Sequence, residues 1–234
     1  MARELPPTEA AAAADFRGIE AWIFDLDNTL YPAHCDLFAQ IDTKMTRYVA
    51  DLLDVSDDDA RIVQKAYYRD HGTTLNGLMQ RHGVEPEDFL AFVHDIDLAA
   101  LEPDAILHAG IARLPGRRVI FTNGCTNHAE RVLAKLGLTE LFSEIWDIRA
   151  TGYRPKPDRS GYDAMQAQLG GRRAAMFEDA ARNLVPAHEV GWTTVWLKNG
   201  SVWSKQGPEH PIPSEEHIHH TIFDLPEFLH AIRI

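Results

Sequence analysis

The sequence predicts an α/β protein, with a parallel β-sheet between two layers of helices and an all-helical insertion near its N-terminal end. Two observations lead to this prediction. Short apolar runs that end in polar residues alternate with helical patterns over most of the 234 residues, which is typical of βαβ units with a sheet covered on both faces. From about residue 33 to 99, apolar residues instead recur at helical spacing, with no convincing strand between them.

Five apolar runs are candidates for the strands. A strand that is buried on both faces of a sheet has a nearly continuous apolar sequence, unlike the alternating pattern of a half-exposed strand. The first run, Trp22–Phe24, has this character and leads directly into Asp25 and Asp27. The five candidate strands lie within residues 22–27, within 117–124, around Ile145 and Trp146, within 173–180 and within 192–200.

Helical patterns separate these runs, and three of them end at a glycine suited to a helix C-cap. They cover residues 127–136, 159–169 and 181–190, which end at Gly137, Gly170 and Gly191. A last short helix is expected within residues 224–232, and the proline-rich residues 204–220 are expected to form a surface loop.

The chain is expected to divide into a leader, a core and an insertion. Residues 1–18 combine prolines, acidic residues and an alanine run, and we expect them to be a flexible leader. Residues 19–32 and 100–234 should form a Rossmann-like core, and residues 33–99 the helical insertion. The chain would leave and re-enter the core at hinges near Tyr31-Pro32 and Glu102-Pro103.

Composition excludes several classes of partner. The net charge is −12, with 35 acidic against 23 basic residues, so a general nucleic-acid or anionic-membrane binder is disfavoured. No apolar run approaches the length of a membrane span. The two cysteines, Cys35 and Cys125, lack metal-ligand spacing and are expected to be free thiols in a reducing, cytoplasmic protein.

Polar residues with complementary chemistry follow the candidate strands. The carboxyl ends of parallel strands meet at one edge of a sheet, which is where function collects in this architecture. A phosphoryl group would need the whole set: a carboxylate nucleophile, hydroxyl and amide donors, a fixed positive charge and a hard divalent cation such as Mg²⁺. The set consists of Asp25, Asp27, Thr122, Asn123, Lys156, Glu178 and Asp179.

The motifs DLDNTLYP, FTNG, KPD and FEDAARN resemble, in order and spacing, the four motifs of the haloacid dehalogenase-like (HAD) hydrolase superfamily. The helical insertion resembles the C1-type cap of that superfamily. The first motif, extended to FDLDNTLYP, and the insertion segment YYRDHGTTLNGLM are similar to the pyrimidine 5′-nucleotidase branch.

The resemblance implies a role for each motif residue. Asp25 would be the nucleophile and a metal ligand, and Asp27 would be the general acid and then the general base, with its backbone carbonyl on the metal. Thr122 would hold phosphoryl oxygens, Lys156 would neutralise charge between nucleophile and phosphate, and Asp179 would bind Mg²⁺.

Other motif positions receive supporting roles from the same resemblance. Backbone amides around Leu26 and Asn28, together with Asn123, would bind the phosphate, and Glu178 would lie near the metal. Asn183 occupies a position where family members often have aspartate, and its role stays open.

The expected function is therefore Mg²⁺-dependent hydrolysis of a small phosphate monoester through an aspartyl-phosphate, with a pyrimidine nucleoside 5′-monophosphate as the expected substrate. A sugar-phosphate or phosphoglycolate phosphatase on the same core is an alternative. A phospho-accepting or ligand-binding regulatory domain is the alternative outside enzymes. A dehalogenase is disfavoured, because that reaction has no leaving alcohol for Asp27 to protonate. Monomer and homodimer both stay open.

Several residues have less specific expectations. His71, Thr73 and Thr74, in a turn of the insertion, are candidates to contact the substrate, although a solvated turn explains them equally well. The remaining expectations concern side chains without a chemical role: a packed thiol at Cys125, an exposed tail at His217, His219 and His220, and an aromatic core of the insertion at Tyr67, Tyr68, Phe89 and Phe92.

Overall fold

The structure, a computed structural model, describes residues 14–200 and 215–234. Within these ranges six strands form one parallel sheet in the order β3-β2-β1-β4-β5-β6. The strands are β1 (Ala21–Phe24), β2 (Arg117–Phe121), β3 (Glu144–Trp146), β4 (Ala174–Glu178), β5 (Thr193–Leu197) and β6 (His220–Ile222).

Strand β1 lies inside the sheet, between β2 and β4, and has no exposed residue. Because side chains alternate along a strand, Trp22 and Phe24 enter one apolar core while Ala21 and Ile23 enter another on the opposite face. Phe24 stacks on Phe177 of β4, with ring centroids 4.7 Å apart. The apolar sequence of β1 thus reflects burial on both faces.

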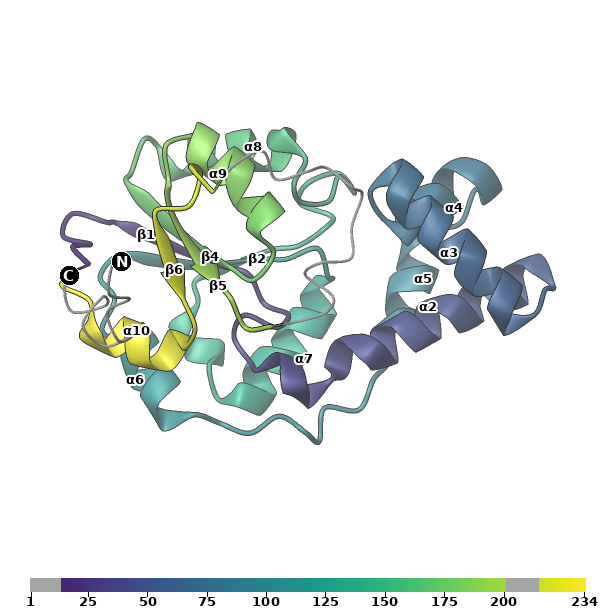
Figure 1. Cartoon of the computed structure of the whole chain (residues 1–234), viewed down its shortest axis with the longest axis horizontal. Coiled ribbons are helices and arrows are strands. Elements are labelled where there is room, and N and C mark those ends of the chain that lie inside the picture. The colour runs from purple at the N-terminus through teal and green to yellow at the C-terminus, as the bar shows by residue number, and fades with distance from the viewer. Residues whose placement is uncertain (1–13, 201–214) are drawn as a thin grey trace, which may run out of the picture.

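Helices cover both faces of the sheet, as Figure 1 shows. One face packs against α8 (Arg159–Leu169) and α9 (Leu184–Glu189), with the short 3₁₀ helix η3 (Ala181–Asn183) before α9. The other face packs against α6 (Ala105–Ala112), α7 (Thr126–Leu136) and α10 (Leu225–Ala231), and the 3₁₀ helix η2 (Thr139–Leu141) follows α7. The predicted Rossmann-like α/β fold is confirmed.

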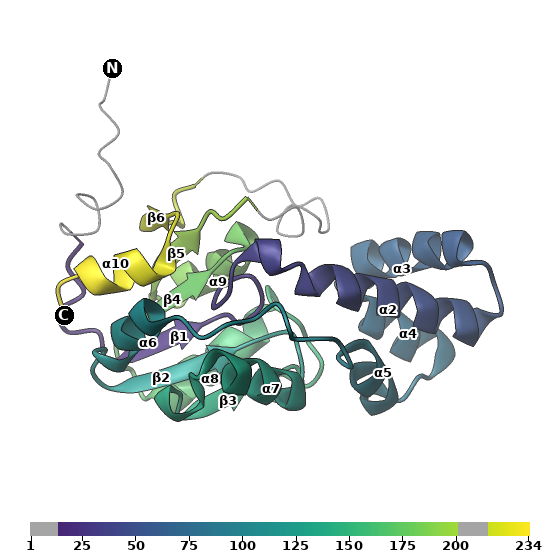
Figure 2. The ribbon, with the colours of Figure 1, turned by 90° about the horizontal axis from the view of Figure 1, so that it is seen from below.

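A helical cap lies beside this core (Figures 1 and 2). It follows the 3₁₀ helix η1 (Ala33–Cys35) and contains α2 (Leu37–Leu53), α3 (Asp57–His71), α4 (Thr74–His82) and α5 (Pro86–Val93). Local sequence explains where these helices begin: the Ser56 side chain caps α3 by accepting the Asp59 N–H, and Pro86 occupies the first turn of α5. None of the helices in the described ranges is long and apolar enough to cross a bilayer.

Two elements of the core were not predicted. Strand β6 is only three residues long and its sequence, His-Thr-Ile, is not apolar enough to be recognised. Helix α6 is apolar on nearly every side, so it lacks the periodic pattern of a surface helix. Its Gly110 lies against Leu229 of α10, where an added Cβ would be 2.9 Å from the leucine Cβ.

The expected leader boundary at residue 18 is wrong. Ala14 and Phe16 are buried, and the Phe16 N–H donates to the carbonyl of Arg233 at 2.8 Å. Phe16 also packs on Trp22 and Phe228, with both ring centroids 5.8 Å away. The chain is therefore tied to the core from Ala14 onward, and residues 1–13 lie outside the described ranges.

Two expectations about side chains outside the motifs are also wrong. The three histidines do not form an exposed tail: His217 is buried, with Nε2 3.0 Å from the carbonyl oxygen of Ala181, and His220 belongs to β6. Phe92 is 37% exposed and so is not part of the cap core. The part of the predicted proline-rich loop before residue 215 lies outside the described ranges.

We predict that Phe16→Ala lowers the free energy of unfolding by about 3–5 kcal/mol, because it removes a buried ring from a packed aromatic cluster. Urea unfolding followed by tryptophan fluorescence would measure the loss. Phe223→Ala is the matched control: Phe223 is 62% exposed, and its substitution should change stability by less than about 0.5 kcal/mol. Equal effects of the two substitutions would contradict the packing of the N-terminal segment.

Candidate active site

A cavity of about 210 Å³ lies between the carboxyl edge of the sheet and the cap. The core supplies its polar base and the cap supplies a wall that is largely apolar. The base contains Asp25, Asp27, Asn28, Thr122, Asn123, Lys156, Glu178, Asp179 and Asn183. This set includes every site residue that was predicted outside the cap, except Leu26. Leu26 is fully buried.

Asp25 continues the line of β1, since its N–H donates to the carbonyl of Phe177 on the neighbouring strand. Its side chain is buried and both oxygens have partners. Oδ1 accepts from the ammonium of Lys156 at 2.7 Å, and Oδ2 accepts from the hydroxyl of Thr29 at 2.9 Å. This carboxylate is held in one orientation at the base of the cavity.

Lys156 reaches the centre of the base because the side chain of Asn123 holds its backbone. The Lys156 N–H donates to Asn123 Oδ1 at 2.7 Å, and Asn123 Nδ2 donates to the Lys156 carbonyl at 3.2 Å. The loops that follow β2 and β3 are thereby joined. Both ends of the Asn123 amide therefore take part in holding the backbone of Lys156.

The ammonium of Lys156 bridges two carboxylates from different strands. Besides Asp25, it donates to Glu178 Oε2 at 2.7 Å, and the Lys156 side chain is almost fully buried. Burial alone would lower the pKa of this lysine, but the two neighbouring carboxylates outweigh burial and raise it. Lys156 is therefore held as a permanent cation.

Asp25, Glu178 and Asp179 form a buried acidic cluster, in which one oxygen from each lies within 4.8 Å of the others. Burial raises the pKa of both Asp25 and Asp179, and repulsion from Glu178 raises it further. Lys156 opposes the shift in each case. Three hard oxygen donors in a buried cluster are the donor set of a divalent oxygen-preferring cation. Glu178, predicted only as a supporting residue, is a full member of this cluster.

Thr122 lies at the end of β2 with its hydroxyl group in the cavity wall. The N–H of Gly124 donates to Thr122 Oγ1 at 2.9 Å, which leaves the hydroxyl hydrogen available for an acceptor in the cavity. Space around position 124 is tight: an added Cβ would be 3.3 Å from both the Thr122 hydroxyl oxygen and the ring of His128.

Asp27 has different surroundings from Asp25, because the chain leaves the strand and turns over residues 27–30. Asn28 has φ 61°, a left-handed conformation that asparagine tolerates better than most residues. Asp27 Oδ1 accepts from the hydroxyl of Tyr31 at 2.6 Å and lies 2.8 Å from Nε2 of His128. Burial raises the pKa of Asp27, but the imidazole and the phenol hydroxyl outweigh burial and hold the pKa at about 2.

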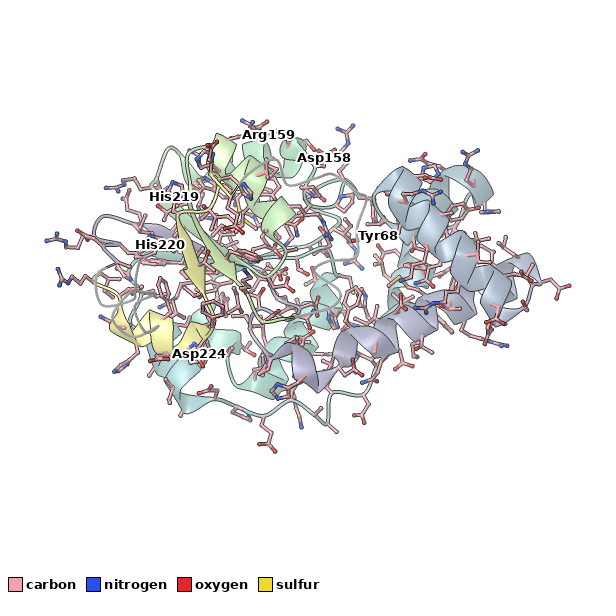
Figure 3. All side chains as sticks on the ribbon, in the orientation of Figure 1. Tyr68, Asp158, Arg159, His219, His220 and Asp224 are labelled. Carbon is pink, nitrogen blue, oxygen red and sulfur yellow. The ribbon has the colours of Figure 1, made fainter. Side chains whose placement is uncertain are left out.

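Sequence reasoning missed His128, which lies behind Asp27. It also missed two residues that line the cavity, His94 and Arg182. His94 follows α5 and stacks on His128, with ring centroids 4.5 Å apart. Arg182 donates to the hydroxyl of Tyr68 at 2.7 Å and so joins core to cap. Figure 3 shows Tyr68 on the side of the cap that faces the core. No local pattern marks these residues, since each acts across a tertiary contact.

The structure places the three cap candidates differently, and their contact with a substrate stays a prediction. Thr73 and Thr74 line the cavity, but His71 does not, and its Nδ1 lies 3.0 Å from Oε1 of Gln80. The Thr73 side chain caps α4 by accepting the Asn76 N–H, and the Thr74 hydroxyl donates to the Gln64 carbonyl. Both hydroxyls therefore have structural partners.

Asn183, whose role the sequence left open, is buried in the cavity wall. Its carbonyl accepts from the hydroxyl of Tyr162 at 2.7 Å, which anchors η3 to α8. Its side-chain Oδ1 is buried with no hydrogen-bond partner among the described residues. A buried polar atom without a partner is rare, and it leaves Asn183 able to accept from a bound ligand or water.

The cap wall combines apolar rings with one buried polar network. Asp42 of α2 accepts from Gln64 Nε2 at 2.7 Å, from Lys65 at 2.8 Å and from Arg61 at 3.0 Å. Gln64 in turn accepts from the hydroxyl of Thr46 at 2.5 Å. Apolar side chains surround this network, and those lining the cavity are Phe38, Ile41, Met45, Leu75, Phe89, Leu90 and Val93.

The fold and the site define a capped α/β protein whose acidic cluster surrounds one buried lysine at the carboxyl edge of a parallel sheet. The chain belongs to the haloacid dehalogenase-like hydrolases, whose family profile matches residues 19–191. The resemblance predicted from the motifs is thus confirmed at the level of the superfamily. Its narrower branch, the pyrimidine 5′-nucleotidases, stays a prediction.

One individual relative aligns with part of this chain at low sequence identity. Phosphate metabolism protein 8 of Saccharomyces cerevisiae is 27% identical over 138 residues, which cover 54% of this chain and 42% of the yeast protein. The aligned region therefore spans less than half of that relative.

Two solved structures show the same fold. A HAD phosphatase from Thermococcus onnurineus matches with a TM-score of 0.60 at 18% identity, over 92% of this chain and 100% of its own. An L-2-haloacid dehalogenase matches with a TM-score of 0.56 at 15% identity, over 91% and 98%. A phosphatase and a dehalogenase share the fold to nearly the same degree, so the reaction has to be argued from the site.

We predict that Lys156→Met, measured with a chelator present, lowers the free energy of unfolding by about 3–5 kcal/mol, because it leaves two buried carboxylates without their cation. Adding Glu178→Gln to that variant should recover part of the loss, since it removes one unpaired charge. Chemical denaturation at pH 7 would compare the three proteins. A loss below about 1 kcal/mol would indicate a solvated ion pair instead of a buried one.

Proposed function

We propose that the protein is a Mg²⁺-dependent phosphomonoester hydrolase that acts through an aspartyl-phosphate on Asp25. The observation that carries the proposal is the convergence of Asp25, Lys156 and the acidic cluster with Thr122 at one cavity. A tetrahedral anion bound there would contact a nucleophilic carboxylate, a hydroxyl donor and a cation.

The charge of the site supports a divalent cation. Asp25, Glu178 and Asp179 carry three potential negative charges in a buried region, and Lys156 supplies one positive charge. Two negative charges are left without compensation, which one divalent cation would balance. Asp25 and Asp179 fit the role of side-chain ligands, and Glu178 lies beside them. A bound Mg²⁺ would supply positive charge that stabilises the phosphoryl oxygens.

The roles of the protein side chains follow from their contacts. Thr29 and Lys156 orient the two oxygens of Asp25, so that this carboxylate is fixed for attack on phosphorus. The Thr122 hydroxyl hydrogen is free to donate to a phosphoryl oxygen. A proton for the leaving oxygen would come from Asp27. This residue lines the cavity and is separate from the contact of Lys156 with Asp25 and Glu178.

Asp27 has a low pKa in the free protein, yet an acid must carry a proton. A phosphate dianion bound beside this carboxyl raises its pKa, because a like charge disfavours the ionised form. Substrate binding would therefore favour protonation of Asp27. The ionised form, regained once the leaving oxygen has taken the proton, would then suit the activation of water.

The cap wall supports a substrate larger than phosphoglycolate. Its aromatic and aliphatic side chains fit a ring, while the Asp42–Gln64 network and Tyr68 offer a polar edge. A nucleoside 5′-monophosphate combines these features, and we retain a pyrimidine base as the proposed preference. Sugar phosphates remain the alternative within phosphatases. Two free thiols, Cys35 and Cys125, fit the cytoplasmic location proposed for the protein.

The reaction is tested by phosphate release from UMP, CMP, purine nucleotides, sugar phosphates and phosphoglycolate, with Mg²⁺ or with chelator. We expect phosphate release only when Mg²⁺ is present, and we expect UMP or CMP to release phosphate fastest. Asp25→Asn should lower kcat by at least about 10³-fold, because an amide oxygen is a poor nucleophile of nearly the same shape. Thermal unfolding of the variant controls for its fold. Unchanged turnover by Asp25→Asn would refute the proposed mechanism.

The metal proposal has a readout independent of activity. The raised pKa of Asp25 and Asp179 means that the folded protein binds more protons than the unfolded chain, so without metal its stability falls as pH rises through those values. Mg²⁺ binds the ionised carboxylates, and its stabilisation should therefore be larger at pH 8 than at pH 5, about 2.7 kcal/mol at a Mg²⁺ concentration 100 times Kd. Differential scanning calorimetry with and without Mg²⁺ would measure the difference.

Asp179→Asn should abolish most of the Mg²⁺-induced rise in Tm, since it removes a ligand without emptying the volume. The same Mg²⁺ effect in this variant, or an effect that does not change with pH, would contradict binding at the acidic cluster.

A further inference from the structure

We propose that His128 is a positioning residue for Asp27. Together with Tyr31 it holds Oδ1 of that carboxyl, so that the proton transferred to the substrate resides on Oδ2. The inference rests on the proposed function, because it assigns a task within the proton transfer described above. His128 lies on α7, outside the four motifs.

Two donors converge on one oxygen of Asp27. The Tyr31 hydroxyl is 2.6 Å from Oδ1, and Nε2 of His128 is 2.8 Å from the same atom. Within the described ranges, every side-chain hydrogen bond to this carboxyl ends on Oδ1. The Asp27 side chain is still 17% exposed and lines the cavity, so Oδ2 is the oxygen left for a ligand.

The surroundings of the imidazole decide which nitrogen carries its hydrogen. His128 is fully buried, and its Nδ1 has no hydrogen-bond partner among the described residues. A hydrogen on Nδ1 would be a buried donor without an acceptor, which is unfavourable because its hydrogen bond to water is lost and not replaced. A ring with one hydrogen therefore carries it on Nε2, where it donates to Asp27.

These two donors constrain the protonated form of Asp27. Oδ1 accepts two hydrogen bonds, which occupy both of its lone-pair directions. A proton on Oδ1 would displace one donor and leave a buried hydroxyl or imidazole N–H unpaired. The proton is therefore placed on Oδ2, and the carboxyl group cannot rotate without breaking both bonds.

The ring of His128 is itself held in place from the cap. His94, at the end of α5, stacks on it with an interplanar angle of 17°, and Cys125 Sγ lies 3.3 Å from Nδ1 of His94. Gly124 leaves the space that the ring occupies, because a Cβ there would be 3.3 Å from the ring. The orientation of Asp27 thus depends on residues from both core and cap.

This arrangement serves a reaction of two steps, in which every proton transferred comes from Asp27 or from water. The Asp25 carboxylate forms a bond to phosphorus, the bond from phosphorus to the leaving oxygen breaks, and that oxygen takes the proton from Oδ2 of Asp27. Asp27, now ionised, next takes a proton from water as the water oxygen bonds to phosphorus. The bond to Asp25 breaks, and inorganic phosphate leaves with Asp25 regenerated.

Leaving-group dependence separates positioning of an acid from general loss of structure. The ribose 5′-oxygen of UMP needs a proton to leave, whereas the phenolate of p-nitrophenyl phosphate leaves without one. We expect His128→Leu to lower kcat/KM for UMP by about 30-fold or more, and for p-nitrophenyl phosphate by less than about 5-fold. This quantity reports only the steps up to phosphoryl transfer to Asp25, and general acid catalysis supplies about 10²–10⁴-fold to that transfer for UMP only.

His128→Gln is the matched variant that retains a donor. Its side-chain amide can place an N–H near the position of Nε2, so kcat/KM for UMP should recover most of what His128→Leu loses. Leu133→Ala is the structural control, because Leu133 is a buried residue on the same helix with no contact to Asp27 described. It should lower Tm while the ratio of the two substrate rates stays as in the wild type.

The possible failures are distinguishable. An active wild-type protein in which His128→Leu lowers kcat/KM equally for both substrates, or in which His128→Gln behaves as His128→Leu, would overturn the positioning role alone. A wild-type protein that releases phosphate from neither substrate would overturn the proposed function and this inference with it. Imidazole ¹⁵N spectra, assigned with His128→Gln, test the geometry separately: a ring hydrogen found only on Nδ1 would overturn it.

Discussion

The contact of the buried Lys156 ammonium with Asp25 and Glu178 sets the geometry of the site. Those carboxylates come from adjacent strands, β1 and β4, and would repel each other in a buried environment without a cation between them. The lysine reaches them from a loop whose backbone is fixed by Asn123. The order of strands brings these distant segments together, since β1 lies between β2 and β4 and all strands end at the same edge.

Asp25 and Asp27 are only two positions apart in the sequence, but their environments in the folded protein are opposite. Asp25 lies inside the acidic cluster, where burial and Glu178 raise its pKa. Asp27 lies beyond the end of the strand, where His128 and Tyr31 lower its pKa. Two carboxyl groups whose pKa values move apart suit different chemical roles, one as nucleophile and the other as acid and base. The turn at Asn28 is the local feature that separates them.

The cap determines what else can enter the cavity. Its helices bring a polar network at Asp42 and a largely apolar wall over a base that would suit any phosphate ester. Contacts between Tyr68 and Arg182, and between the rings of His94 and His128, connect that wall to the base. The cap and the core of the site are therefore connected by packing. The shared fold alone does not distinguish a phosphatase from a dehalogenase.

The α/β fold, five of the strands and the motif residues at their ends could be predicted from the sequence, because buried parallel strands and glycine-capped helices have local patterns. It could not predict β6 or α6, whose patterns are too short or too uniformly apolar, nor the burial of Phe16. Three contacts are visible in the folded protein alone: Glu178 joins the acidic cluster, Asn123 holds the backbone of Lys156, and His128 contacts Asp27. Those contacts join residues far apart in the chain, and local periodicity carries no information about such distances.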